Sequence, residues 1–325
     1  MLTLVTGGAG FIGSNLVRAL LREGNDVRVL DDLSTGSREN LAGLPVARFT
    51  LGSVTDRACL RDALSGVEVV FHLAALPSVA RSVADPVGVT RANVAGTVNV
   101  LTVSRDAGVR RVVYASSSSV YGDTPTLPKT EELCPSPRSP YAASKLSGEM
   151  YCRAFASVYP LETVSLRFFN VFGPRQDPAS EYAAVIPRFA TAMLAGRRPL
   201  VLGDGHQSRD FTYVENAVRA CILAGAAGPA ASGEAMNAAC GERITLLDLI
   251  TELNRLLGTR IEPEFAPART GDVRHSLAAI DKAQRLIGYR PSVPVRRGLE
   301  ATLAWYAGGS MGDERVAVEP IPAST

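Results

Sequence analysis

A tyrosine and a lysine that could exchange protons with an alcohol lie four residues apart in the stretch SPYAASK, residues 139–145. Four residues is about one helical turn, so Tyr141 and Lys145 would share one face of a helix. Ser139 is a suitable N-cap for that helix, and Pro140 suits its first position. On an isolated surface helix this spacing is common and carries no chemistry, so the rest of the chain must decide.

A glycine-rich turn near the N-terminus indicates a dinucleotide site. Gly7, Gly10 and Gly13 follow an apolar run, residues 2–6, that is typical of a strand, and they open a helical pattern. Such glycines allow a pyrophosphate to approach the backbone at a helix N-terminus. Asp31 follows Gly10 by 21 residues. A carboxylate there could bind an adenosine ribose and would repel a 2′-phosphate, which favours NAD over NADP. A glycine turn without a ligand is the alternative.

The elements that must position these residues follow from the apolar pattern. The predicted strands are residues 2–6, 26–32, 47–52, 67–74, 110–117 and 161–169. The predicted helices are residues 11–23, 56–64, 88–107, 141–157 and, later in the chain, 245–258. This alternation predicts an α/β fold with a doubly wound parallel sheet. Ligands bind at the carboxyl ends of such strands, so the serines after residue 115 can converge with Tyr141 over a cofactor.

The bulk composition excludes several classes of partner. The 325-residue chain has a net charge of +2 and 46% hydrophobic residues, which is typical of a globular protein without nucleic acid or a membrane as its main partner. No apolar run is long enough to span a bilayer, and we do not expect the N-terminal stretch MLTLVTGGAGFIG, which has no basic n-region, to be a signal peptide. The five cysteines and three histidines show no disulfide or metal-ligand spacing. We therefore expect free thiols in the cytoplasm and no metal.

Four motifs together resemble those of extended short-chain dehydrogenases/reductases. They are the glycine turn at residues 7–13, ASSSSVYG at 115–122, the Tyr141–Lys145 pair, and LRFFNVFGPRQ at 166–176. Within the NAD-dependent epimerase/dehydratase family, the chain is most similar to bacterial UDP-N-acetylglucosamine 4-epimerases, from residue 2 to about residue 306. The stretches AAVIPRF, GDGHQSRDF and GDVRHSLA add to this resemblance.

The resemblance implies a catalytic site made of Tyr141, Lys145 and Ser117. Tyr141 would be the acid/base, and the positive charges of Lys145 and the oxidised nicotinamide would favour its phenolate. Ser117 would bridge the phenol and a sugar hydroxyl. NAD would contact Tyr141 and Lys145, and also Gly7, Gly10, Phe11, Ile12, Gly13, Asp31, Ser34, Gly36, Ser53, Val54, Leu73, Ala74, Ala75, Asn93 and Phe168. Without the resemblance, a serine run is a polar strand end and Phe168 is a core residue.

A UDP-sugar is the substrate that the resemblance implies. Arg209 and Arg269 would pair with its diphosphate, because a guanidinium matches phosphate oxygens. Asn170 would hold a phosphate or the sugar. The other implied contacts are Ser118 with the sugar, Leu200 and Leu202 with the uracil, Asp272 with the ribose, and Val185 and Ser276. Two positions depart from the family pattern: Ser53 replaces an aspartate, and Pro77 replaces a glycine.

The implied reaction is 4-epimerisation through a 4-keto sugar. Dehydratases and decarboxylases of the wider family have a carboxylate where this chain has Ser118 and Ser119, which favours epimerisation. Ser276 replaces the bulky tyrosine of narrow UDP-galactose 4-epimerases, so we expect interconversion of UDP-GlcNAc and UDP-GalNAc. The alternatives are UDP-glucose/UDP-galactose epimerisation and, although Asn170 replaces the usual threonine, UDP-glucuronate epimerisation. A non-catalytic, NAD-binding regulatory or structural subunit is the other class.

Past residue 170 the pattern becomes irregular, which predicts a smaller, discontinuous second domain. We expect residues 1–174 and about 203–235 to form a Rossmann NAD-binding domain, and residues 175–202 and 236–310 to bind the nucleotide sugar. The Gly/Ala-rich stretch 225–234 would be a surface connection and residues 311–325 a tail. The resemblance also implies a homodimer through the helices at 88–107 and 141–157.

Overall fold

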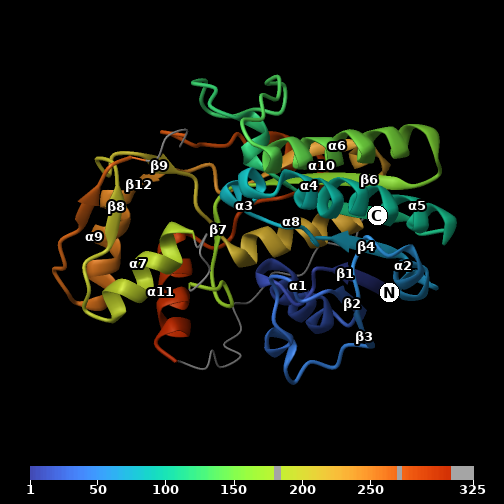
Figure 1. The fold of residues 1–325 in the computed structure, drawn as a ribbon, viewed down its shortest axis with the longest axis horizontal. Helices are drawn as coiled ribbons and strands as arrows, with labels where there is room; N and C mark the ends of the chain where they lie inside the picture. The colour runs from blue at the N-terminus through green and yellow to red at the C-terminus, as the bar shows by residue number, and fades with distance from the viewer. Residues whose placement is uncertain (179–183, 269–272, 309–325) are drawn as a thin grey trace.

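The larger part of the molecule, on the right of Figure 1, is built on a seven-stranded parallel sheet with the strand order β11-β6-β5-β4-β1-β2-β3. The structure is a computed structural model that describes residues 1–178, 184–268 and 273–308. The strands of the sheet are β1 (Leu2–Thr6), β2 (Asp26–Asp31), β3 (Arg48–Leu51), β4 (Val69–His72), β5 (Arg111–Ser117), β6 (Glu162–Phe168) and β11 (Glu234–Ala238). The first six lie where the sequence pattern predicts strands, and the doubly wound fold is confirmed.

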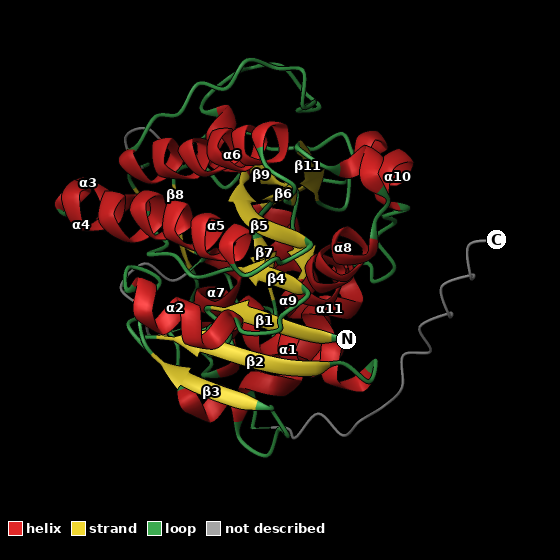
Figure 2. Cartoon of the chain, turned by 90° about the vertical axis from the view of Figure 1, so that its right-hand side faces the viewer, coloured by secondary structure: helices red, strands yellow, loops and turns green. Residues whose placement is uncertain are grey.

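Helices cover both faces of this sheet, so its central strands are apolar on both sides (Figure 2). In β1, Leu4 and Val5 are both fully buried but belong to different apolar clusters, because successive side chains point to opposite faces. On the Val5 face lie α1 (Phe11–Arg22) and α8 (Val214–Ala226). On the Leu4 face lie α2 (Arg57–Leu64), α5 (Gly96–Asp106) and α6 (Pro140–Val158).

The predicted helix at 88–107 is composed of three segments. Pro86 begins α4 (Pro86–Thr90), and the carboxylate of Asp85 caps it by accepting from the Gly88 N–H at 2.8 Å. A π-helical turn, Arg91–Ala95, follows and leads into α5. A further short helix, α3 (Val79–Ala84), precedes them and was not predicted. The π-helical turn carries Asn93, which is buried beside the loop after β4.

A smaller set of elements lies on the left of Figure 1. It contains α7 (Val185–Leu194), β8 (Leu200–Leu202), β9 (Ser208–Arg209), β12 (Ile244–Thr245), α9 (Leu246–Leu257), β13 (Glu264–Ala266) and α11 (Val295–Tyr306). β8 pairs with β13 and β9 with β12. The helix predicted at 245–258 is α9, because Thr245 and Asp248 form a capping box and Gly258 ends it in the left-handed conformation. Beside the large sheet, α10 (Asp281–Ile287) contacts β11.

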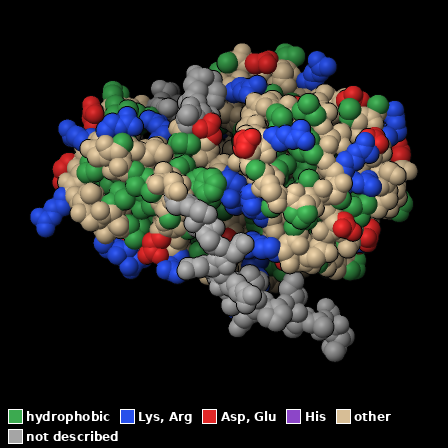
Figure 3. All heavy atoms as spheres, turned by 90° about the horizontal axis from the view of Figure 1, so that it is seen from below, with side chains coloured by type: hydrophobic (Ala, Val, Ile, Leu, Met, Phe, Trp, Pro, Cys, Tyr) green, Lys and Arg blue, Asp and Glu red, His purple; other side chains and the backbone are tan. Residues whose placement is uncertain are grey.

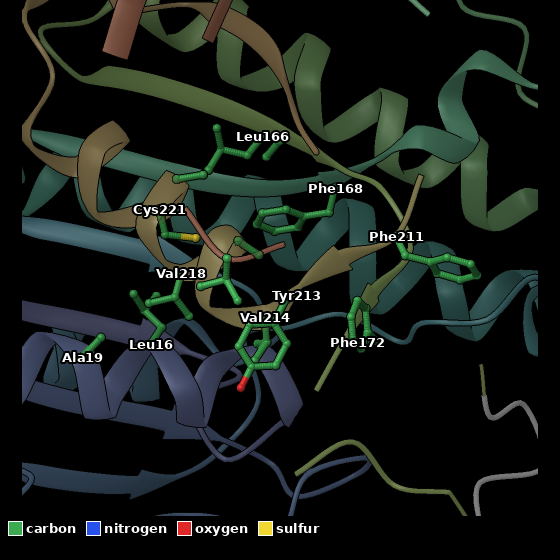
Figure 4. Packing of buried hydrophobic residues seen from close by; sticks show 14 of the residues in the cluster. Leu16, Ala19, Leu166, Phe168, Phe172, Phe211, Tyr213, Val214, Val218 and Cys221 are labelled. Atoms are coloured by element: carbon green, nitrogen blue, oxygen red, sulfur yellow. The ribbon is translucent and has the colours of Figure 1, made fainter. Parts of the chain in front are cut away.

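Two short strands and an aromatic cluster link the two sets of elements. β7 (Val171–Phe172) pairs with β10 (Thr212–Tyr213). The ring centre of Phe172 lies 6.3 Å from that of Phe211 and 5.7 Å from that of Tyr213. In Figure 4 Tyr213 lies next to Val214 at the start of α8, and Phe168 of β6 belongs to the same apolar cluster as these rings. The end of β6 is therefore packed directly against the segment that enters the smaller set.

The stretch 225–234, predicted to be a surface connection, is one only in part. Helix α8 continues to Ala226, and Gly225 is buried against the ring of Phe71. The guanidinium group of Arg111 donates to carbonyl oxygens that end this helix, those of Ala224, Gly225, Ala227 and Gly228. β11 then adds a seventh strand, so residues 236–238, assigned to the second domain above, belong to the large sheet. EAMNA has little β-branched character, and tertiary pairing with β6 overrides that weak propensity.

Acidic and basic side chains are scattered over the face seen in Figure 3, and a group of basic side chains lies near the middle of this view. No helix among the described residues has the length and apolar character needed to cross a membrane.

Candidate active site

The glycine turn between β1 and α1 leaves backbone N–H groups open at the start of a helix. Gly10 caps α1 without a side-chain hydrogen bond, so the first N–H groups of the helix can bind an anion. A methyl group on Gly13 would lie 2.1 Å from the Gly7 carbonyl oxygen, and one on Gly7 would lie 2.7 Å from the Ala74 nitrogen. Glycine therefore allows β1, α1 and the loop after β4 to approach this closely.

A cavity of about 360 Å³ begins at this turn and includes Asp31 at the end of β2. The Asp31 carboxylate accepts hydrogen bonds from the N–H groups of Ala9 and Leu33, at 2.9 and 2.8 Å. Because each carboxylate oxygen has two lone pairs, ribose hydroxyls can still bind to it. An uncapped helix start beside glycines and a carboxylate fits the pyrophosphate and ribose of NAD.

Most of the residues predicted to bind NAD line this cavity. They are Gly7, Gly10, Phe11, Ile12, Gly13, Asp31, Ser34, Ser53, Val54, Leu73, Ala74, Ala75, Tyr141, Lys145 and Phe168. Gly36 and Asn93 do not line the cavity but contact segments that do. A Cβ on Gly36 would lie 2.8 Å from the Ala9 carbonyl carbon. The Asn93 side chain binds the N–H and C=O of Leu76 at 2.8 and 3.2 Å, so it would act by holding the loop after β4.

The three predicted catalytic residues come together in the same cavity. Ser117 ends β5, and Tyr141 and Lys145 lie one turn apart on α6. The Ser117 side chain interacts with the phenol of Tyr141 and lowers the pKa of that phenol. Lys145 Nζ lies 6.0 Å from the centre of the Tyr141 ring and donates to the carbonyl oxygen of Ala115 at 2.8 Å. A hydroxyl of a bound substrate could therefore meet a phenol, a serine and an ammonium group in one place.

Burial shifts the pKa values of both Tyr141 and Lys145. Burial raises the pKa of Tyr141, and its interaction with Ser117 offsets only part of that effect. Burial also lowers the pKa of Lys145 to about 8, against the attraction of the Glu149 carboxylate. Loss of hydration is therefore the dominant influence on the Tyr141 phenol in the protein alone, and it opposes the phenolate.

Two neutral rings, those of Tyr114 and His72, lie on one side of Lys145. Lys145 Nζ lies 5.2 Å from the centre of the Tyr114 ring, and the His72 ring centre lies 5.7 Å from that of Tyr114. The nitrogens of His72 are hydrogen-bonded to the hydroxyl groups of Thr6 and Thr97, at 2.8 and 3.0 Å. Burial, with a smaller effect of Lys145, lowers the pKa of His72 to about 3. His72 is therefore neutral at physiological pH and serves as a structural residue.

A second cavity of about 290 Å³ shares Asn170 and Val171 with the first. Of the predicted substrate residues, Asn170, Val185, Leu200, Leu202 and Arg209 line it. Asn170 has a φ of 37°, a left-handed conformation that asparagine tolerates better than most residues. Its side-chain amide donates to the Asp210 carbonyl oxygen at 3.0 Å. A ligand at Asn170 would face both cavities.

The remaining predicted substrate residues are not in the described linings. Ser118 begins the 3₁₀ turn after β5, and Ser276 donates its N–H to the carbonyl oxygen of Ser208 at 3.0 Å. Ser276 is thus held next to the residue before Arg209, but neither serine lines either cavity. Arg269 and Asp272 lie outside the described residues, as does the predicted tail, 311–325.

Several polar lining residues were not predicted. Asp32 and Gln176 line the first cavity, and Arg188 and Gln207 line the second. Arg188 had a usable signal, because AAVIPRF places it three residues after Val185 on an amphipathic helix. Pro77, which departs from the family pattern, also lines the first cavity. Among the described residues, no group of three or more His, Cys, Asp or Glu side chains could hold a metal ion.

The fold and the site define a dinucleotide-binding enzyme of the extended short-chain dehydrogenase/reductase class. Residues 3–239 match the NAD dependent epimerase/dehydratase family. The chain belongs to this family, which confirms the expected NAD-dependent enzyme.

Three similar proteins illustrate the relationship. The UDP-glucose 4-epimerase of Mycolicibacterium smegmatis is 42% identical over 94% of this chain and 98% of its own length. The solved UDP-N-acetylglucosamine 4-epimerase of Methanobrevibacter ruminantium, in complex with UDP-N-acetylmuramic acid, has a TM-score of 0.88 and 38% identity over 94% of this chain and 98% of that one. The UDP-glucose 4-epimerase of Thermotoga maritima, solved with UDP-glucose, has a TM-score of 0.90 and 38% identity over 95% and 99%.

Proposed function

We propose that this protein catalyses the NAD-dependent 4-epimerisation of a UDP-hexose, with UDP-GlcNAc and UDP-GalNAc as the preferred pair. The observation that carries the proposal is the meeting of two cavities at Asn170 and Val171. Tyr141 lines one cavity and Arg209 the other. A nucleotide sugar with its diphosphate at Arg209 could therefore present its sugar to Tyr141. The three similar epimerases support this assignment.

The acid/base chemistry would be carried by Tyr141. It would take the proton of the sugar 4-hydroxyl and return a proton after the 4-keto sugar has turned over. Ser117 would hold the sugar hydroxyl against the phenol, and Lys145 would bind the nicotinamide ribose. When bound, NAD would supply a reversible acceptor for the C4 hydride and a positive charge. Because burial raises the pKa of Tyr141, that charge is needed to favour the phenolate.

The affinity for the substrate would come mainly from its nucleotide. A sugar that is held tightly in one orientation could not turn over between the two hydride transfers, so uniform contact with it would oppose the reaction. Leu200 and Leu202 would flank the uracil, and Arg209 would pair with the diphosphate. Arg188, which lines the same cavity, adds a second guanidinium group to this side.

The residues after Ser117 favour plain epimerisation over elimination or decarboxylation. Ser118 and Ser119 occupy the positions where related dehydratases and decarboxylases have carboxylates. The N–H of Ser119 donates to the Ser117 hydroxyl oxygen at 3.2 Å, which holds this turn close to the catalytic serine. Without a carboxyl group there, no general acid is placed to expel a hydroxyl as water.

The preference for N-acetylated sugars rests on Ser276. Its small side chain lies in a segment tied to Ser208, beside Arg209, and would leave room for an acetamido group. The likeness to a UDP-N-acetylglucosamine 4-epimerase supports this choice. The likeness to two UDP-glucose 4-epimerases supports the UDP-glucose/UDP-galactose pair as the second candidate.

We also propose that the protein is a cytoplasmic homodimer. The surface near α3, α4 and α6 exposes large apolar side chains, namely Val83, Val87 and Met150, which are 65%, 77% and 48% exposed. A second copy packed over these helices would cover them. The five cysteines are all free, which suits a reducing compartment. Sedimentation of the purified protein tests the dimer, and a monomer at micromolar concentration would contradict it.

The test of the function is incubation of the purified protein with each UDP-sugar, with products identified by their sugar proton spectra. We expect UDP-GlcNAc and UDP-GalNAc to interconvert fastest. Ser276→Tyr should reduce turnover of the N-acetylated pair by about tenfold relative to UDP-glucose, because the larger side chain would fill the acetamido space. Equal loss on both pairs would contradict the role of Ser276. No turnover of any UDP-sugar, with no bound NAD, would favour a non-catalytic subunit.

A further inference from the structure

A buried ion pair lies directly behind the catalytic residues and takes no part in the chemistry proposed above. The side chains of Glu149 and Arg167 are 1% and 4% exposed. Arg167 donates through Nε and Nη2 to the two carboxylate oxygens of Glu149, at 2.9 and 2.7 Å. The Ser116 hydroxyl donates to the same carboxylate at 2.5 Å. The carboxylate is therefore held by three hydrogen bonds inside the protein.

These hydrogen bonds join the three elements that carry the catalytic group. Glu149 lies one helical turn after Lys145 on α6, and both are buried. Its hydrogen-bond donors are paired neighbours on β5 and β6, and the next pair along these strands is Ser117 and Phe168. The carboxylate thus ties α6 to both strands at the edge of the cofactor cavity, which Ser116, Ser117 and Phe168 line.

The packing of α6 on β5 leaves this helix little freedom. A Cβ on Gly148 would lie 2.2 Å from the hydroxyl oxygen of Tyr114, so the helix approaches the strand as closely as glycine permits. Lys145 Nζ reaches the Ala115 carbonyl oxygen from the same face at 2.8 Å. The helix is therefore held at Lys145, at Gly148 and at Glu149, over little more than one turn.

Stability alone does not account for this ion pair. A buried carboxylate and guanidinium lose most of their hydration, and apolar side chains of similar volume are often at least as stabilising. What the pair provides is a fixed geometry and a fixed charge. We propose that Glu149 is a positioning residue for the reaction: it sets Tyr141 and Lys145 against Ser117, and its negative charge keeps the buried Lys145 an ammonium ion. The activity part of this inference rests on the proposed function.

The charge of Lys145 depends on few neighbours. Among the described residues, the titratable groups that face Lys145 or Glu149 are His72 on β4, Tyr114 on β5, Tyr141 and Cys152 on α6, and Arg167 on β6. Burial keeps four of them neutral: it lowers the pKa of His72 to about 3, raises that of Cys152 to about 12, and raises the pKa values of both tyrosines. Glu149 is the anion of this group, and Arg167 is its second cation.

The test uses Glu149→Gln and follows Lys145 directly. The chain has three lysines, Lys129, Lys145 and Lys282, so protein labelled with carbon-13 at the lysine Cε gives three signals that can be titrated without turnover. Lys145→Met assigns the signal. In Glu149→Gln we expect Lys145 to lose its proton about one pH unit lower, because the remaining neighbour is a cation.

Glu149→Gln should also lower kcat without weakening the binding of the UDP-sugar or NAD. We expect kcat to fall on the order of tenfold to a hundredfold, since small displacements of reacting groups have effects of this size. The alkaline limb of the kcat profile should move to lower pH in step with the Lys145 titration. The KM for the UDP-sugar and the content of bound NAD should stay near the parent values, because no group that would bind either has been removed.

Glu162→Gln is a matched control. Glu162 lies at the opposite end of β6 and also pairs with a buried arginine, Arg111, at 2.7 Å. It should leave the Lys145 titration and kcat unchanged even if the protein is less stable. Ser116→Ala keeps the ion pair and removes only its hydrogen bond to β5, so it should slow turnover without moving the titration.

Three results would overturn the proposal. They are parental titration and kcat in Glu149→Gln, an equal shift in Glu162→Gln, or, where Glu149→Gln does not fold, a parental kcat in Ser116→Ala. If the parent protein turns over no UDP-sugar, the proposed function fails, whereas the lysine titration still decides whether Glu149 sets the charge of Lys145.

Discussion

The two cavities that meet at Asn170 are built in different ways. The first lies at the carboxyl ends of neighbouring strands of one sheet, and its polar groups are bonded to backbone that the sheet holds in place. The second is assembled from β7, α7, β8, β9 and the start of α9, which are joined by loops and two-stranded pairings. The first region, around the first cavity, is thus built mainly from one sheet, and the second region, around the second cavity, from separate segments.

The two regions also differ in charge. Behind the catalytic group, burial keeps His72 and Tyr114 neutral, and Glu149 and Arg167 neutralise each other. The second region instead has two arginines, Arg188 and Arg209, among the residues that line its cavity. We therefore expect substitutions in the first region to change kcat and substitutions in the second to change KM.

The largest effect should follow from Tyr141→Phe. Removal of the phenolic hydroxyl should lower turnover about a thousandfold, because it removes the proposed general acid/base. The affinity for UDP, measured by calorimetric titration, should change by less than about twofold. Tyr151→Phe is the matched control, since Tyr151 lies on the same helix and is 42% exposed. If Tyr141→Phe were as active as the parent, the first region would not control kcat and the two regions would not differ in role.

Asp210 lies in the second region but is buried, so it tests whether burial alone is enough to shift the pKa of a carboxyl group. It lies next to Arg209, yet its carboxylate is fully buried and accepts from the N–H groups of Cys240, Gly241 and Ala278 at 3.0, 3.0 and 3.2 Å. Burial raises its pKa to about 6, against these hydrogen bonds. The folded state therefore binds the proton more tightly than the unfolded state, in which the pKa is near 3.8.

The contribution of Asp210 to stability is then complete below about pH 4 and is lost as the pH rises through about 6. Asp210→Asn cannot titrate. The free energy of unfolding of the parent should therefore fall relative to that of the variant by about 2.5 kcal/mol between about pH 4 and pH 7. Urea unfolding at both pH values measures this difference. If the difference in the free energy of unfolding between parent and variant did not vary with pH, burial would not raise the pKa of Asp210.

The smallest effect should follow from Arg209→Met. Loss of a charge-assisted hydrogen bond to phosphate should raise the KM for the UDP-sugar by about tenfold, with kcat within about threefold of the parent. Arg255→Met is the control, because Arg255 pairs with Glu252 on the surface of α9. A fall in kcat at constant KM would mean that Arg209 acts on the reacting sugar, and the two regions would no longer differ in role.

Prediction from the sequence succeeded where structure is local. The glycine turn and the shared face of Tyr141 and Lys145 depend on spacing within one turn or one helix, and the structure brings them to one cavity. It succeeded less well where position depends on distant segments. Ser118 and Ser276 lie outside the described cavity linings, and β11 joins the sheet despite a stretch with weak strand propensity. Pairing between remote segments leaves no periodic pattern in either one.

The sequence by itself determined the doubly wound sheet, the dinucleotide turn and the alignment of Tyr141 with Lys145. These follow from the alternation of strand and helix patterns, from the spacing of three glycines, and from the spacing of two residues on one helix. The tertiary structure alone decided that Glu149 is paired with Arg167 and Ser116, that Tyr141 is less acidic in the protein alone, and that two cavities meet at Asn170. These properties depend on burial and on distances between residues far apart in the chain, and neither quantity is set by local spacing.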